Sequence, residues 1–288
     1  TCDNGISAAR EVALAKELGM DIVVTDHHEI PFEDADGERK YILPSADAIV
    51  NPKQPGCRYP NKNICGAVVA MKVVYALYEK HGIPEKEKEA FLEPAAIATV
   101  GDIMDLQGEN RILVKEGLER LPYTSNKGLK ALISAIGLDG QKISSYDIGF
   151  RLGPCINASG RLDTAMRSLA LLQAEDEDEA ARLAGDLKAL NDSRKALTET
   201  GTKSAYEMID GSSLKDDRVL VVFLPECHES LAGIIAGRVR EKYHRPAFVL
   251  TRGEQMVKGS GRSIEAYSMY EELTKCKGLL EAYGGHPM

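Results

Sequence analysis

The hydrophobic pattern in the first half of the chain alternates between helical periodicity and short apolar runs. Residues 8–18 carry apolar side chains at helical spacing, whereas residues 22–24 and 48–50 form short runs typical of buried parallel strands. Residues 66–78 and 95–102 are again helical in character. Strands that alternate with helices predict an α/β fold built on a parallel sheet.

The pattern changes after Leu162. Residues 163–209 show helical periodicity with few breaks, and the acidic run at 175–179 predicts a bend followed by a helix start. Such a segment can be a simple surface helix, but we interpret it as a bridge between two lobes because a new strand–helix pattern follows it. The second lobe is predicted to contain strands at 219–223 and 246–250 and helices at 230–243 and 269–280.

The expected architecture is therefore α/β with two lobes. It comprises an N-terminal parallel-sheet domain at residues 1–162, a long connecting helix at 163–210 and a smaller C-terminal α/β domain at 211–288. The length of 288 residues and the 43% hydrophobic content are sufficient for two modest cores.

Composition narrows the functional class. The sequence has no run of about 18 apolar residues, so we expect no membrane association. Its six cysteines form no C-x-x-C pair, which argues against zinc ribbons and predicts free thiols in a cytoplasmic protein. The net charge of −8 argues against a protein that coats nucleic acid by charge alone. It is compatible with a local basic groove and with a metal site built from aspartates.

Candidate chemistry lies where apolar elements end. Asp3 ends one apparent strand, residues 26–28 (Asp-His-His) end the next, and Asp102 ends a later apolar element. Ligands of parallel sheets bind beyond the carboxyl ends of the strands, and aspartates with few histidines favour Mn²⁺ or Mg²⁺. Adjacent histidines on a strand point opposite ways, so His27 and His28 cannot do the same job unless the chain has already left the strand. One can bind metal while the other meets substrate. Taken singly, an aspartate at a strand end is more often a turn former or a helix cap.

Several segments resemble the DHH phosphoesterase family. The V-V-T-D-H-H sequence at 23–28 resembles the motif that names this family, and residues 1–7 are similar to its second motif. The fourth motif is matched by residues 100–102 with 108–111, and the signature of RecJ-type members by residues 153–162. The DHH-associated lobe is matched by residues 228–238, 258–263 and 284–286. Their common order makes the resemblance specific over nearly the whole chain, with the two lobes matching a DHH domain and a DHH-associated domain.

The RecJ-type resemblance implies a metal-dependent exonuclease that hydrolyses single-stranded DNA from 5′ to 3′ in DNA repair and recombination. It implies two Mn²⁺ (or Mg²⁺) ions, which activate water and stabilise the leaving oxygen. The implied partners are single-stranded DNA, a single-strand-binding protein and a helicase, and we expect a monomer. Two alternatives stay open: a DHH-type phosphodiesterase for very short oligonucleotides or cyclic dinucleotides, and a catalytically inactive binding module.

The resemblance also implies roles for individual residues of the first lobe. Asp3 would bridge two metal ions, while His27 and Asp102 would each ligate metal. Asp26 would support the site from close range, with direct contact to metal left open, and His28 would face the scissile phosphate.

The second lobe, together with Asn157 and Arg161 from the segment before it, would bind the DNA strand. Arginine offers a two-pronged partner to phosphate and lysine a point charge. The residues implied in binding are Asn157, Arg161, His228, Lys258, Ser260, Arg262, Gly284, Gly285 and His286. Cys155 stands where RecJ-type members usually have arginine, so one substrate contact of the family is not assigned here.

Both ends of the sequence lead us to expect a fragment of a longer protein. Residues 1–3 read as the end of a strand, and residues 284–288 read as a turn. The family's first motif, an Asp-rich D-x-D-type segment, would lie upstream of Thr1. Since that motif supplies further aspartates to one of the metals, the fragment alone is expected to have little nuclease activity.

Overall fold

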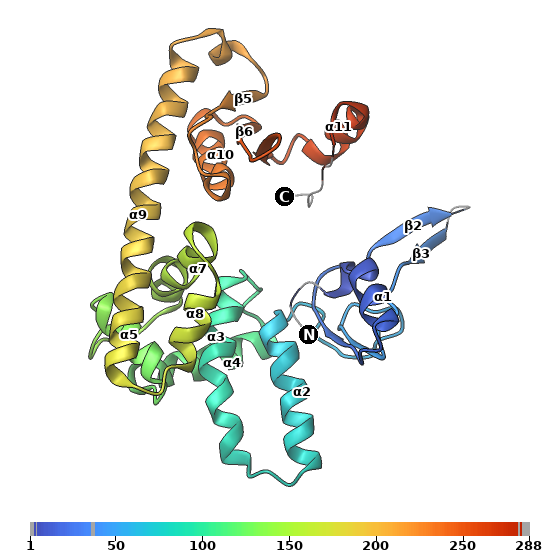
Figure 1. Ribbon diagram of the computed structural model, residues 1–288, viewed down its shortest axis with the longest axis vertical. Helices are drawn as coiled ribbons and strands as arrows, with labels where there is room; N and C mark the ends of the chain where they lie inside the picture. Colours follow the sequence, from blue (N-terminus) through green and yellow to red (C-terminus); the bar gives the residue numbers. More distant parts are fainter. Residues whose placement is uncertain (1–2, 4, 36–37, 282, 284–288) are drawn as a thin grey trace. The chain divides into compact units, whose positions relative to one another are not determined.

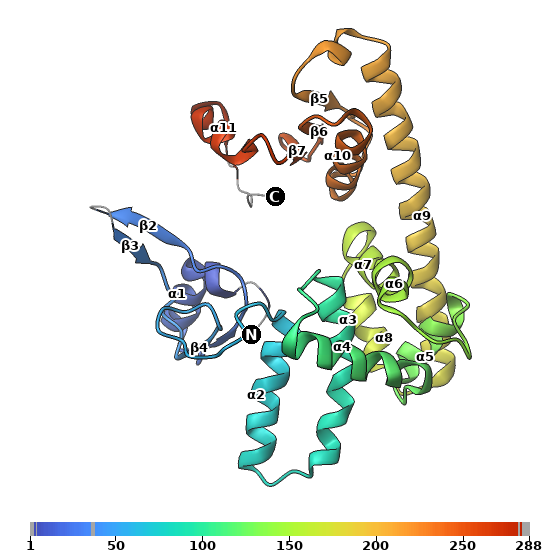
Figure 2. The same ribbon diagram turned by 180° about the vertical axis from the view of Figure 1, so that it is seen from behind.

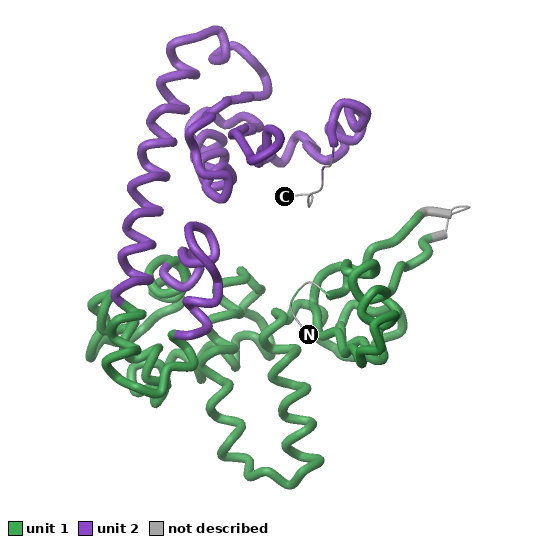
Figure 3. The backbone as a smooth tube through the Cα atoms, in the orientation of Figure 1, with its two compact units in different colours: residues 1–154, 171–184 green, residues 155–170, 185–288 purple. Residues whose placement is uncertain are grey.

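A computed structural model describes residues 3, 5–35, 38–281 and 283. This part of the chain divides into two compact units (Figure 3). The first unit contains residues 1–154 and 171–184, and the second contains residues 155–170 and 185–288.

The first unit begins with a small α/β segment (Figure 1; Figure 2). Strands β1 (Val23–Thr25) and β4 (Ala48–Val50) pair in parallel, with Val24 opposite Ile49. The 3-10 turn η1 (Gly5–Ser7) and helix α1 (Ala9–Glu17) precede β1. The predicted parallel sheet is therefore confirmed, although only two of its strands lie among the described residues.

An antiparallel hairpin separates the two parallel strands. It consists of β2 (Phe32–Ala35) and β3 (Glu38–Tyr41), with Phe32 opposite Tyr41. The sequence analysis did not predict this hairpin, because its strands are rich in charged residues and lack a continuous apolar face.

The rest of the first unit is helical. Helices α2 (Gly66–Lys80) and α3 (Leu92–Gly101) enclose a core that includes Val68, Val69 and Ala95, as their apolar sequences predict. The remaining elements in chain order are η2 (Glu85–Phe91), α4 (Gly108–Arg120), η3 (Leu121–Tyr123), α5 (Lys127–Ala135), α6 (Ser145–Asp147) and the π-helical turn η4 (Ile148–Leu152).

The long helical region is interrupted at residues 163–165 and again at residues 174–176, near the acidic run. Helix α7 (Gly153–Leu162) precedes α8 (Met166–Gln173), and the 34-residue α9 (Glu177–Asp210) follows after a break at residues 174–176. The predicted bend and helix start are therefore confirmed. The acidic residues at the start of α9 suit the positive end of its dipole. At 1.5 Å per residue, α9 is roughly 50 Å long.

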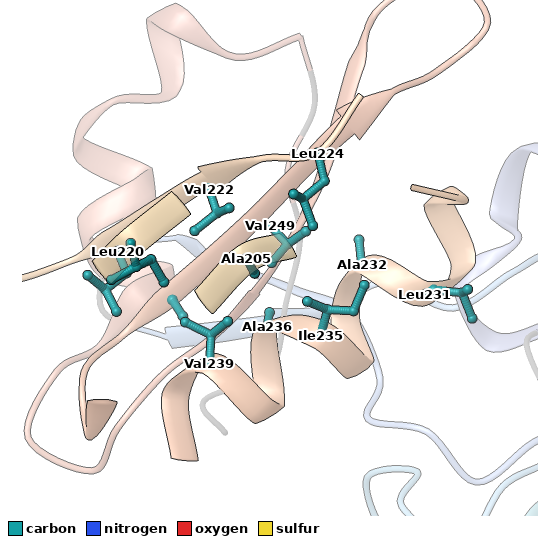
Figure 4. Packing of buried hydrophobic residues seen from close by; sticks show 12 residues of the cluster. Ala205, Leu220, Val222, Leu224, Leu231, Ala232, Ile235, Ala236, Val239 and Val249 are labelled. Atoms are coloured by element: carbon teal, nitrogen blue, oxygen red, sulfur yellow. The ribbon is translucent and has the colours of Figure 1, made fainter. Parts of the chain in front are cut away.

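The second unit contains a three-stranded sheet in the order β5–β6–β7. Strands β5 (Leu220–Phe223) and β6 (Ala247–Arg252) are parallel, and β7 (Val257–Arg262) pairs with β6 in antiparallel register. Helix α10 (Glu229–Tyr243) packs on this sheet, and Figure 4 shows Ile235 and Val239 of the helix facing Val249 and Leu220. The short elements η5 (Ser213–Asp216), α11 (Met269–Lys275) and η6 (Lys277–Leu279) complete the unit.

The α/β class predicted from the sequence is confirmed. None of the helices in the described part of the chain is both long and apolar enough to cross a membrane.

Candidate metal centre

The structure brings the predicted metal-site residues of the first unit together. Asp3, Asp26, His27 and His28 each offer a ligand atom, and these atoms all lie within 4.8 Å of one another. Asp102 joins the group from the end of α3, with its Oδ2 atom 3.3 Å from Nε2 of His27. Nε2 of His27 also lies 3.2 Å from Oδ1 of Asp3.

The buried imidazole of His27 has the chemistry of a metal ligand. Its side chain is 6% exposed, and its Nε2 atom has no hydrogen-bond partner among the described residues. Buried polar atoms are nearly always partnered, so an unpartnered nitrogen aimed at two carboxylates calls for a ligand. One imidazole and two carboxylates form a donor set that suits Mn²⁺.

Asp26 fixes the backbone around the site with its buried carboxylate. Its carboxylate is fully buried and accepts hydrogen bonds from the backbone N–H groups of Ile6, His27 and His28 at 2.8, 2.7 and 3.1 Å. Burial raises the pKa of Asp26, but these hydrogen bonds and that of the His28 ring outweigh it, so the net pKa is lowered. Asp26 is therefore an ionised acceptor that ties η1 to the end of β1.

His28 is oriented by the same carboxylate. Its Nδ1 atom lies 2.8 Å from Oδ1 of Asp26. Because an ionised carboxylate only accepts hydrogen bonds, Nδ1 carries the proton and Nε2 is the nitrogen left for a substrate.

The two histidine rings lie close together, with centroids 4.4 Å apart. Strand β1 ends at Thr25, so the chain has already left the strand at both histidines and the exception expected for that case applies.

Gly66 is a site residue that the sequence analysis did not single out. A Cβ atom at this position would lie 1.9 Å from Oδ1 of Asp3. The first residue of α2 must therefore lack a side chain for Asp3 to reach His27. Partial burial raises the pKa of Asp3, against the opposing effect of His27 and His28.

The loop after Asp102 is anchored by a buried amide. Asn110, in the first turn of α4, is 1% exposed and donates to the backbone oxygens of Asn63 and Asp105 at 2.6 and 3.0 Å. Its neighbour Glu109 accepts a hydrogen bond from the Tyr59 hydroxyl and pairs with Lys72. The sequence analysis placed residues 108–111 in a motif but gave them no task; the structure shows that they fix the loop beside Asp102.

Replacing Asn110 with aspartate is expected to lower the free energy of unfolding by about 3 kcal/mol, because a buried carboxylate would replace the amide that donates to two backbone oxygens. Urea denaturation measures this change. The same substitution at the exposed Asn157 is the control and should change stability by less than about 0.5 kcal/mol. Equal stability of the two variants would show that Asn110 does not anchor the loop.

The predicted binding residues of the second unit fall into two groups. Arg161 on α7 donates to the backbone oxygen of Ser230 at 3.0 Å, and the Ser230 hydroxyl donates to the backbone oxygen of Arg161 at 3.0 Å. His228 caps α10 by accepting from the backbone N–H of Ser230 at 3.3 Å. Asn157 is exposed on α7. Arg161 and His228 thus meet near the start of α10.

The second group follows strand β7. The exposed Lys258 pairs with Glu229 at 2.8 Å, and Nη1 of Arg262 lies 3.3 Å from the hydroxyl of Ser260. Gly233 of α10 lies against the side chains of Ser260 and Arg262. A Cβ atom at this glycine would be 2.8 Å from Oγ of Ser260 and 2.9 Å from Nη2 of Arg262. The predicted residues Gly284, Gly285 and His286 lie outside the described residues.

Cys155 has an interior position in this chain. Its thiol is buried and accepts a hydrogen bond from Nδ2 of Asn191 at 3.4 Å, and burial raises its pKa. A neutral, buried thiol contributes to packing between α7 and α9.

Two family models match the chain. The DHH family N-terminal domain matches residues 1–99, and the DHHA1 domain matches residues 216–288. The chain therefore belongs to the DHH family.

Curated relatives match along the whole chain. It is 39% identical to the single-stranded-DNA-specific exonuclease RecJ of Bacillus subtilis and 35% identical to that of Escherichia coli, with 100% of this chain covered in each case. It spans 35% and 52% of the lengths of these two relatives.

Solved structures agree in fold. The manganese complex of RecJ from Thermus thermophilus has a TM-score of 0.83 at 34% identity, covering 99% of this chain and 40% of that one. A second structure, exonuclease RecJ bound to manganese, has a TM-score of 0.80 at 34% identity and covers 99% of this chain and 67% of the other.

Proposed function

We propose that this chain provides the DHH and DHHA1 portions of a RecJ-type nuclease that hydrolyses single-stranded DNA with Mn²⁺ or Mg²⁺. The observation that carries the proposal is the buried Nε2 atom of His27, which is unpartnered among the described residues and lies 3.2 and 3.3 Å from the carboxylates of Asp3 and Asp102. Support comes from relatives named as single-stranded-DNA-specific exonucleases and from RecJ structures with Mn²⁺ and Mg²⁺.

The protein's own residues would divide the work. Asp3, His27 and Asp102 would hold two divalent ions, which when bound lower the pKa of water and neutralise phosphate charge. Asp26 accepts the hydrogen bond of Nδ1 and orients the His28 ring. When the ring carries both protons, Nε2 of His28 would donate a hydrogen bond to the scissile phosphate. Water is the proposed nucleophile, and no nucleophilic side chain is required.

The finer parts of the proposal follow the family resemblance. They are 5′-to-3′ polarity, a role in DNA repair and recombination, and work alongside a single-strand-binding protein and a helicase in the cytoplasm. The test is hydrolysis by the full-length protein of a long single strand labelled at either end, with Mn²⁺ added or chelated. Mononucleotides released first from the 5′ end, only with metal, would support it. Cleavage of dinucleotides or cyclic dinucleotides but not of long strands would instead favour the small-substrate alternative.

Arg262 provides a separate prediction about strand binding. Replacing it with alanine in the full-length protein is expected to weaken binding of a single strand and to reduce the slope of log affinity against log salt by about 0.7, the value for one phosphate contact. Fluorescence anisotropy at several salt concentrations measures both. Arg252→Ala removes an exposed arginine from the neighbouring strand β6 and serves as the control. If the two variants have the same salt slope as the parent, Arg262 does not grip phosphate.

A further inference from the structure

Helix α3 ends in an unusual way directly after Asp102. The N–H of Ile103 bonds to the oxygen of Val100 at 3.2 Å, and the N–H of Met104 bonds to the oxygen of Thr99 at 3.0 Å. This pair of bonds is the Schellman ending, whose left-handed position is usually occupied by glycine. Here the position holds Ile103 with a φ of 55°. A branched side chain in this conformation is a strained choice.

The fold does not compensate for that strain by burying the side chain. Ile103 is 89% exposed. Among the described residues, the other positions with positive φ hold His244 and the glycines Gly19, Gly56, Gly82, Gly108, Gly137 and Gly140. An exposed isoleucine therefore occupies a position that the rest of this chain gives mostly to glycine. A backbone outlier of this kind, one residue after Asp102, points to a function for the exposed side chain.

A pair of exposed aromatic rings lies at the same end of α3. Tyr146 and Phe150 stack with centroids 4.7 Å apart, and they are 64% and 66% exposed. They flank the start of η4, whose Gly149 packs beside Val100, two residues before Asp102. A π-helical turn is rare and is frequent at functional sites.

We propose that Ile103 and the Tyr146–Phe150 pair form a surface that contacts the nucleobases of the strand held at the metal centre. The inference rests on the proposed function. In that function the carboxylates and His27 act on the phosphate of single-stranded DNA, and each phosphate of the strand has a base with apolar faces next to it. Base stacking on aromatic rings tolerates every sequence, as a nuclease of this kind requires. Single-stranded DNA is thus the occupant that matches both features at this end of α3.

The experiment compares two strands of equal length and charge in the full-length protein. One is oligothymidylate, and the other carries abasic residues at the positions around the cleaved bond. Ile103→Gly suits the left-handed conformation, so it should fold with unchanged or higher thermal stability. Its KM for the thymidylate strand should rise about tenfold, while its KM for the abasic strand stays the same. Phe150→Leu, which keeps an apolar side chain but removes the ring, should behave in the same way, and Ile103→Val should remain close to the parent.

Each other outcome counts against the surface. A parent enzyme that hydrolyses single strands, with variants that keep its full preference for the base-containing strand, would overturn the base-contact surface and leave the proposed function intact. Variants that lose stability but keep the preference would mean that another protein segment covers this surface. If the parent protein neither hydrolysed nor bound single-stranded DNA with any metal, both proposals would be overturned.

Discussion

Replacing His27 with alanine is expected to reduce hydrolysis of single-stranded DNA by roughly a thousandfold or more, because several kcal/mol of metal-derived stabilisation are lost with the ligand. The buried Nε2 atom lies 3.2 Å from the carboxylate of Asp3 and 3.3 Å from that of Asp102. Binding of Mn²⁺, measured by calorimetry without substrate, should weaken in parallel.

The matched control is His81→Ala. This residue caps the far end of α2 and is exposed. It should leave both Mn²⁺ binding and hydrolysis near the parent values. A His27 variant that kept its Mn²⁺ affinity but lost activity would show that His27 acts on the substrate rather than on metal.

Replacing Gly66 with alanine is expected to weaken Mn²⁺ binding by about 10- to 100-fold, the range seen when a residue that orients a ligand is changed. The new Cβ atom would lie 1.9 Å from Oδ1 of Asp3, so either the carboxylate or the start of α2 must move. Since Asp3 is exposed and the helix is packed, we expect the carboxylate to move and overall stability to change little. Calorimetric titration with Mn²⁺ and thermal unfolding test the two parts separately.

Gly185→Ala provides the control for the backbone effect of the substitution. Gly185 lies within α9 with nothing within 4 Å of its added Cβ atom. Alanine there should raise stability by about 0.5–1 kcal/mol and leave Mn²⁺ binding unchanged. If Gly66→Ala behaved like Gly185→Ala in both measurements, the close approach of Asp3 to α2 would not matter for the metal centre.

The positions of three strands were predictable from apolar runs in the sequence. The runs at 22–24 and 48–50 overlap the parallel pair β1 and β4, and the run at 219–223 contains β5. Their burial was not predictable from these runs, because β4 has no buried residue and β5 alternates buried with exposed positions. Strand β7 was not predicted as a strand. Its Lys-Gly-Ser-Gly-Arg sequence has low strand propensity, and its pairing depends on the neighbouring β6.

The candidate site was predictable as a set of residues but not as a geometry. Aspartates and histidines at element ends could be named from the sequence, and the DHH resemblance joined them. The contribution of Gly66 could not be foreseen, because the absence of a side chain matters only when Asp3 approaches α2. The anchoring by Asn110 likewise depends on two backbone oxygens that are 47 and 5 residues away in the sequence.

Anomalous diffraction would show where manganese binds in this protein. Crystals of the full-length protein equilibrated with Mn²⁺ can be measured at the manganese absorption edge. We expect an anomalous peak about 2.2 Å from Nε2 of His27 and in contact with Asp3 and Asp102. A fully loaded crystal with no such peak beside Nε2 of His27, or with manganese bound only elsewhere, would contradict this expectation.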